Sequence, residues 1–178
     1  MIKEIVRNIT GRKRVIPFPE GFNISSEEAA KVISLQEMID RIFGRSLRIR
    51  QVDAGSCNAC EWECTALTNP VYDIQRFGID FVASPRHADI LLVTGPVSRQ
   101  MELALKKTYL ATPGPRIVIA CGDCTIDGGI YKGSYAVTNG VANVVPVDCY
   151  IPGCPPTPVQ LIVGIHSLID KMIRANTK

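Results

Sequence analysis

Short apolar runs of strand length alternate with longer helical segments along most of this chain. The strand-like runs read "SLRIRQVDAG", "IDFVAS", "DILLVTG", "RIVIACG" and "NVVPVDCYIPG", and segments such as "QMELALKKTYLAT" separate most of them. Strands that alternate with helices favour a mostly parallel sheet with helices on both faces. The sequence therefore predicts an α/β fold built on an open sheet.

One connection in this pattern is too short for a helix. Only the few residues around 84–88 lie between "IDFVAS" and "DILLVTG", whereas parallel neighbours need a crossover of about a dozen residues or more. We therefore expect either an extended crossing between parallel strands or an antiparallel strand at the edge of the sheet.

The first 45 residues have a different character. "MIKEIVRNITGRKRVIPFPEGFN" is basic and interrupted by proline and glycine, which is typical of an arm. The following segment predicts an amphipathic helix that begins at Ser25 or Ser26 and ends at Gly44. Its apolar positions recur at spacings of three and four: Val32, Leu35, Met38, Ile39 and Ile42. We expect residues 1–45 to form an arm and a docking helix, and residues 46–178 to form the α/β domain.

Composition narrows the class of protein. The net charge of +3 is too small to indicate a nucleic-acid partner, and no apolar run approaches the roughly 20 residues of a membrane span. The N-terminus has no apolar segment typical of a secretory signal. Seven cysteines in such a chain favour metal binding or catalysis over a disulfide framework. We therefore expect an intracellular protein that uses its cysteines chemically.

Four cysteines follow the C-terminal ends of predicted strands. Cys57 and Cys60 come after the first strand, Cys124 follows "RIVIACG", and Cys154 follows "VVPVDCYIPG". In an open parallel sheet these strand ends line one crevice, where ligands bind. The sequence therefore predicts that four thiols on three loops converge at one edge of the sheet.

Glycines accompany these cysteines. A glycine lets the backbone approach a bulky group and direct N–H groups toward it, and such donors stabilise an anionic cluster held by thiolates. The glycines in question are Gly55, Gly122, Gly128, Gly129 and Gly153.

Two other cysteine sites remain open from the residues alone. A zinc site could use Cys57, Cys60, Cys121 and Cys124, although about 60 residues separate the two pairs, against roughly 15–20 in zinc ribbons. A thioredoxin-like dithiol at Cys57 and Cys60 would leave Cys124 and Cys154 without a role.

The remaining cysteines favour a simpler interpretation. Cys64 and Cys149 are expected to be buried, hydrophobic thiols, Cys64 because it lies four residues after Cys60 on a predicted helix. Cys121, at a strand end three residues before Cys124, fits either a packing or a ligand role.

Four motifs together resemble a known family. "GSCNACEWE", "SPRHADILLVTGPV", "ACGDCTIDGGIY" and "PVDCYIPGCPPTP", in this order, are similar to the small electron-transfer subunit shared by energy-converting [NiFe] hydrogenases and respiratory complex I. The resemblance runs from about Leu47 to the last helix. It implies a flavodoxin-like domain over residues 46–178 that holds one [4Fe–4S] cluster. The matching ligand positions are Cys57, Cys60, Cys124 and Cys154, and Glu63 matches an acidic position near the cluster.

The spacing of the first two ligand positions distinguishes branches of the family. Two residues separate Cys57 from Cys60, as in the hydrogenases, whereas the corresponding cysteines of complex I are adjacent. The resemblance thus implies a cytoplasmic subunit, peripheral on the inner face of the cell membrane, with no catalytic residue of its own. Its implied partners are a [NiFe]-type large subunit, a ferredoxin-like iron–sulfur subunit and membrane-anchored subunits. The alternatives are a complex I-like quinone reductase, a sulfur-reducing relative and a zinc-stabilised interaction module.

Overall fold

The computed structural model describes residues 26–176, and side chains within residues 35–174. The predicted N-terminal arm lies outside these residues. Within them, no helix has both the length and the apolar character needed to cross a membrane.

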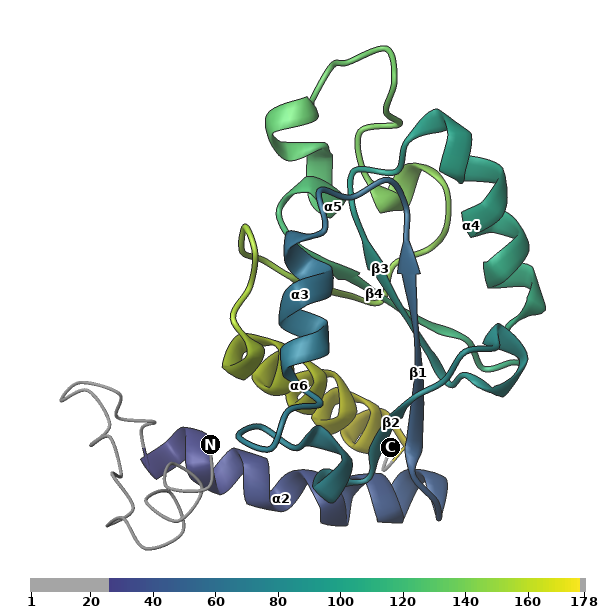
Figure 1. The fold of residues 1–178 in the computed structure, drawn as a ribbon. Coiled ribbons are helices and arrows are strands. Elements are labelled where there is room, and N and C mark those ends of the chain that lie inside the picture. The colour runs from purple at the N-terminus through teal and green to yellow at the C-terminus, as the bar shows by residue number, and fades with distance from the viewer. Residues whose placement is uncertain (1–25, 177–178) are drawn as a thin grey trace, which may run out of the picture.

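The centre of the fold is a five-stranded parallel sheet in the order β2-β1-β3-β4-β5 (Figure 1). This strand order is that of flavodoxin-like folds, so the predicted α/β architecture is confirmed. The strands are β1 (Leu47–Asp53), β2 (Ile79–Phe81), β3 (Ile90–Thr94), β4 (Ile117–Cys121) and β5 (Cys149–Ile151).

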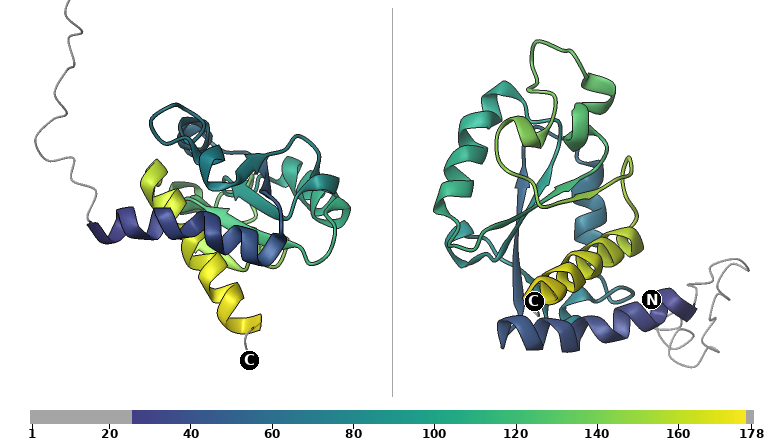
Figure 2. Two further views of the ribbon diagram at one scale, coloured as in Figure 1. Left: turned by 90° about the horizontal axis from the view of Figure 1, so that it is seen from below. Right: turned by 180° about the vertical axis from the view of Figure 1, so that it is seen from behind.

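Helices cover both faces of the sheet. α2, α3 and α6 lie on one face and α4 on the other, as the front and back views show (Figures 1 and 2). The α-helices are α2 (Ser26–Phe43), α3 (Ala59–Ala66), α4 (Arg99–Ala111), the short α5 (Cys124–Asp127) and α6 (Pro158–Asn176). Short 3-10 helices are η1 (Ile74–Phe77), η2 (Pro85–His87), η3 (Gly129–Tyr131) and η4 (Val141–Asn143).

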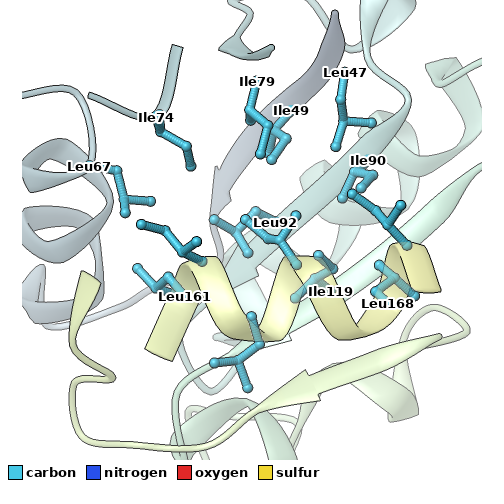
Figure 3. Close-up of a cluster of buried hydrophobic side chains, with 14 of the residues drawn as sticks. Leu47, Ile49, Leu67, Ile74, Ile79, Ile90, Leu92, Ile119, Leu161 and Leu168 are labelled. Carbon is cyan, nitrogen blue, oxygen red and sulfur yellow. The ribbon is translucent and has the colours of Figure 1, made fainter. Parts of the chain in front are cut away.

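Alternate residues of the strands point into two separate cores. Ile49, Leu92 and Ile119 are fully buried against α3 and α6 (Figure 3), whereas Leu91 packs with Leu105 of α4 on the other face. This alternation follows from the two-residue period of a strand, and burial on both faces explains why these runs are apolar throughout.

The amphipathic helix predicted before the first strand is present as α2. Leu35 and Ile39 are fully buried in the core on the α6 side, and α2 packs against α6 and η1 (Figure 2). The apolar side of this helix therefore covers the core of the same chain. The division between residues 45 and 46, and docking by the rest of the N-terminal segment, stay predictions.

The short connection from β2 to β3 is an extended crossing between parallel strands. Phe81 at the end of β2 and Ile90 at the start of β3 both pair with Ile49 of β1. Because both ends of the link lie at the same height on β1, the chain crosses only about two strand spacings, roughly 10 Å. No return along a full strand is needed, which explains how so few residues suffice.

The last strand is shorter than the sequence pattern predicted. Only Cys149–Ile151 form β5, because Pro146 has no N–H to donate and the chain before it turns into η4. A capping box forms at the start of α6, as the spacing of Thr157 and Gln160 in the sequence indicates. The Thr157 N–H donates to Gln160 Oε1 at 2.8 Å, and the Gln160 N–H donates to Thr157 Oγ1 at 3.3 Å.

Candidate metal centre

Four of the five strands end at the same height, which determines where the cysteine loops begin. Cys57, Cys124 and Cys154 each follow within four residues of this level, at the edge marked by α5 in Figure 1. The loops of the predicted ligands therefore leave the sheet side by side. The aligned terminal residues are Asp53, Thr94, Cys121 and Ile151.

The loops after β4 and β5 are joined by hydrogen bonds. The Asp123 N–H donates to the Gly153 carbonyl at 2.9 Å, and the Gly153 N–H donates back to Asp123 Oδ1 at 2.8 Å. Each bond lies one residue from a predicted ligand, so Cys124 and Cys154 are held next to each other.

The loop after β1 is held by its own polar side chains. Asp53 Oδ1 accepts the N–H groups of Gly55 and Ser56, each at 2.8 Å. The Ser56 hydroxyl accepts the Asn58 N–H at 2.9 Å and donates to Glu61 Oε2 at 2.6 Å. This network sets the path between the end of β1 and the first turn of α3, where Cys57 and Cys60 lie.

Glu61 also connects α3 to the centre of the sheet. Its second carboxylate oxygen accepts a hydrogen bond from the hydroxyl of Thr94, a fully buried residue at the end of β3. The sequence motif points to Glu63, which is partly buried, and not to Glu61. The available signal was a threonine at the end of an otherwise apolar strand, since a buried hydroxyl needs a partner.

The four predicted ligand thiols share one electrostatic environment. Cys60 is buried, Cys124 is half-buried, and Cys57 and Cys154 are exposed. Burial, and then the nearby Cys60 and Cys57 thiols, raise the pKa of Cys124 to about 11, with Cys154 contributing in the same direction. The Cys57, Cys60 and Cys154 thiols are thus near enough to Cys124 to act on its pKa, and a ligand role for the four stays a prediction.

Gly122 borders this site directly. A Cβ atom there would lie 2.8 Å from Cys60 Sγ and 3.9 Å from Cys124 Sγ, so both sulfurs flank the same point. The lack of a side chain at Gly122 thus leaves room for the two thiols. Its N–H donates to the Ile151 carbonyl at 2.9 Å.

Two more of the predicted glycines, Gly55 and Gly153, make room for the protein itself. A Cβ at Gly55 would lie 2.7 Å from Ser98 Oγ, and one at Gly153 would lie 2.6 Å from Pro156 Cα. The N–H groups of both are used within the loops, by Asp53 and Asp123. A direct role of Gly55 and Gly153 toward a cofactor stays a prediction.

Gly95, at the end of "DILLVTG", belongs to the site but was missed. Its backbone N–H hydrogen-bonds to Cys124 and opposes the rise in the pKa of that thiol. A Cβ at Gly95 would lie 2.7 Å from the Ser56 backbone nitrogen, so the loops after β1 and β3 touch here. The signal was its place directly after a strand, as for Gly122.

Two further thiols lie behind Cys60. Cys64 and Cys121 are 2% and 0% exposed, and the Cys121 thiol hydrogen-bonds to both Cys60 and Cys64. The hydrogen bond from Cys121 lowers the pKa of Cys60, against burial and the carboxylates of Glu61, Asp123 and Glu63. The bonds to Cys60 and Cys64, with burial, raise the pKa of Cys121.

The expected packing roles agree with this arrangement in part. Cys64 belongs to the buried core, and Cys149 is a half-buried residue packed against it.

Within residues 26–176, no three cysteine, histidine or acidic side chains lie close enough together to hold a single metal ion.

The donor set nonetheless fits an iron–sulfur cluster in its chemistry. Thiolate sulfur is the usual ligand of such clusters, and the four thiols lie on loops that follow aligned strand ends. Each thiol loses its proton when it binds metal, so the raised pKa of Cys124 makes loading favoured at higher pH.

Comparison with known proteins identifies the family. Residues 57–168 match the family described as "NADH ubiquinone oxidoreductase, 20 Kd subunit", a range that begins at Cys57 and includes Cys154. The chain belongs to this family. It is therefore a complex I-like oxidoreductase subunit, which confirms the resemblance seen in the four motifs.

Two curated relatives carry names of hydrogenase subunits. The chain is 41% identical to formate hydrogenlyase subunit 7 of Escherichia coli, over 94% of this chain and 66% of that protein. It is 42% identical to the "Probable membrane-bound hydrogenase subunit mbhJ" of Pyrococcus furiosus, over 75% of this chain and 80% of that one. The chain thus spans slightly less than two thirds of the first relative.

A solved structure agrees with the fold. A chain of the membrane-bound sulfane sulfur reductase, an archaeal respiratory membrane complex, superposes with a TM-score of 0.64 at 33% identity. The alignment covers 82% of this chain and 76% of that chain.

Proposed function

We propose that this chain is the electron-transfer subunit of a membrane-bound [NiFe] hydrogenase complex and holds one [4Fe–4S] cluster. Cys57, Cys60, Cys124 and Cys154 would ligate it, and the large catalytic subunit would receive the electrons. The observation that carries the proposal is that these four thiols leave the sheet from one level and share one electrostatic environment.

The role of the chain's own residues is to fix the position and the surroundings of the cluster. When bound, such a cluster supplies one-electron redox chemistry. The hydrogen bonds between Asp123 and Gly153 hold two ligand loops, and the Ser56–Glu61–Thr94 network holds the third. Gly122 leaves space beside Cys60, and the Gly95 N–H is directed at Cys124.

The proposed partners follow from the relatives' names and from the resemblance. They are a [NiFe]-type large subunit, a ferredoxin-like subunit that delivers electrons, and membrane-anchored subunits. The chain would then lie on the cytoplasmic face of the cell membrane as a peripheral part of the complex. We further propose that residues 1–45 dock to these partners. Deleting the first 24 residues should weaken assembly of the complex and leave the cluster intact, whereas loss of the cluster would contradict this docking role.

The test is anaerobic purification of the complex through a tag on this chain. Iron, sulfide, nickel and zinc are measured, and reduced samples are examined by electron paramagnetic resonance. We expect iron and sulfide in near-equal amounts, nickel on a co-purifying large subunit, and one cubane signal that is absent when Cys154 is replaced by alanine. Zinc without iron would establish the zinc-stabilised interaction module and refute electron transfer.

A sulfur-reducing complex is the second candidate. The 33% identity and TM-score of 0.64 to the sulfane sulfur reductase chain favour it as an alternative to the hydrogenase assignment. Iron without nickel would support this alternative or the quinone reductase. The C-x-x-C spacing argues against the complex I form, but it does not separate a hydrogenase from a sulfur-reducing relative. A sulfane-sulfur and a quinone reduction assay on the same preparation would then separate these two.

A further inference from the structure

A cavity of about 530 Å³ lies at the amino ends of the strands, at the end of the sheet opposite α5 and the cysteine loops (Figure 1). Its walls come from the segments that lead into three neighbouring strands: residues 42–48 at β1, residues 86–89 at β3 and residues 113–117 at β4. Met172 of α6 completes the lining. None of the predicted cluster ligands contributes to it, so a ligand bound here is separate from the candidate metal centre.

The lining of this cavity carries an excess of positive charge. Arg45, Arg48 and Arg86 all belong to it, and Asp89 is the one acidic residue among its lining residues. Arg45 already occupies that carboxylate, because its Nη1 and Nη2 donate to Asp89 Oδ2 and Oδ1 at 2.9 and 2.7 Å. The backbone N–H of Arg48 donates to Asp89 Oδ2 at 2.9 Å as well. Two positive charges are therefore left uncompensated.

These two charges belong to guanidinium groups without a partner. Within residues 35–174, neither the Arg48 nor the Arg86 side chain makes a hydrogen bond or an ion pair. Asp80 pairs with Arg48 in the register of β1 and β2, yet no ion pair joins their side chains. A guanidinium presents five N–H donors in a planar fork that matches the oxygens of a phosphate. The cavity thus offers two unused forks to an oxyanion.

The wall beside these arginines is apolar. Ile42 and Phe43 at the end of α2, and Met172 of α6, line the cavity and pack against the core on its inner side. Pro113 and Pro115 are exposed and line it near β4. A volume of about 530 Å³ lies in the range of sites that enclose an organic ligand, and apolar side chains contribute nothing to the binding of a bare phosphate. The lining therefore fits an amphiphile with an anionic head.

We propose that this cavity binds the headgroup of an anionic phospholipid, with Arg48 and Arg86 donating to the phosphate. The apolar wall then contacts the part of the lipid next to the headgroup. Basic side chains close to a membrane are attracted to anionic lipids, which agrees with the two uncompensated charges. The inference rests on the proposed function, because it needs the chain to lie at the surface of the cell membrane.

The experiment is photocrosslinking of the purified complex in phosphatidylcholine vesicles. One sample contains phosphatidylglycerol with a photoreactive group in its acyl chain, and a second contains phosphatidylcholine with the same group. Labelled peptides of this chain are identified by mass spectrometry. We expect the anionic probe to label the peptides that contain Phe43 and Met172, and the zwitterionic probe to label them much less.

Arginine substitutions measure the contribution of charge. A basic side chain near an anionic surface strengthens binding by about fivefold. Arg48→Gln and Arg86→Gln should each need about fivefold more phosphatidylglycerol for half-maximal labelling, and the double variant about 25-fold more. The corresponding lysine variants keep the charge and should lose less. Arg76→Gln is the matched control, because Arg76 is an exposed arginine outside the cavity, and it should behave as the wild type.

Three results would overturn the inference. Equal labelling by the two probes, or the same loss in Arg76→Gln, would exclude a site that recognises the anionic headgroup. Suppression of the labelling by inorganic phosphate at the concentration of the anionic lipid would identify a small oxyanion as the ligand. Absence of labelling, together with loss of a co-purifying subunit from the double variant, would make the cavity a protein interface. Purification of the wild-type chain without membrane-anchored subunits would instead refute the proposed location itself, so the two failures are distinguishable.

Discussion

Replacement of Gly122 by alanine tests the site with a single methyl group. Gly122 has a φ of +99°, and the added Cβ would lie 2.8 Å from Cys60 Sγ, 3.6 Å from the Gly153 carbonyl oxygen and 3.9 Å from Cys124 Sγ. Only the first of these contacts is shorter than an ordinary van der Waals distance. The substitution therefore acts mainly by pushing the Cys60 sulfur away.

Two physical effects set the size of the change. A side chain at positive φ costs about 1–2 kcal/mol relative to glycine. A comfortable contact is about 3.5–4.0 Å, so the sulfur must move by roughly 1 Å, and a displaced rotamer costs about 0.5–1.5 kcal/mol. The second effect alone corresponds to roughly a fivefold weaker hold on the cluster, since 1.36 kcal/mol is a factor of ten.

Gly133→Ala separates these two effects. Gly133 has a φ of +77°, and its Cβ would have no heavy atom within 4 Å. Both variants therefore have the backbone cost, and only Gly122→Ala has the contact with sulfur. The assay is the iron retained per chain by the complex after a fixed exposure to a chelator. We expect Gly133→Ala to match the wild type and Gly122→Ala to lose iron about fivefold more readily. Equal retention in the two variants would refute the placement of Cys60 in the cluster site.

Three further substitutions test other parts of the structure. Glu61→Ala should destabilise the chain by about 2 kcal/mol in chemical denaturation, because it removes a carboxylate that accepts hydrogen bonds from Ser56 and Thr94; Glu61→Gln should be milder. Leu92→Ala should lower the free energy of unfolding by about 2–5 kcal/mol, since Leu92 is fully buried; a change below 1 kcal/mol would contradict its core position. Thr157→Ala should cost about 1 kcal/mol through the lost cap of α6, and Thr157→Ser should restore most of it.

The edge of the sheet that bears the site could be predicted because local patterns determine it. Each apolar run predicts a strand, and the C-terminal ends of parallel strands meet at one edge. Cys57, Cys124 and Cys154 each follow such an end by three or four residues. Their convergence needed only the strand positions and the parallel arrangement, both of which the alternation of strands and helices indicates.

Contacts that depend on register were not accessible in the same way. The short link from β2 to β3 allows a parallel β2 only because Phe81 and Ile90 both pair with Ile49 of β1. No local sequence pattern specifies that alignment. Glu61 and Gly95 have roles only because the ends of β1 and β3 bring their loops into contact. The length of β5, which has only three residues, is likewise limited by Pro146, because proline has no N–H to donate. How much that matters depends on the neighbouring strand to which an N–H at this position would donate.

The buried thiols show why packing and function are not exclusive interpretations of one residue. The four-residue spacing that directs Cys64 into the core is the same spacing that places it on the side of α3 occupied by Cys60. The alignment that ends β4 at the level of Thr94 and Ile151 places Cys121 in the same buried core as Cys60 and Cys64. A cysteine that is fully buried can therefore fill the core and still lie beside a predicted ligand. At such a position the substitution that distinguishes the two roles is one that keeps the volume and removes the S–H group.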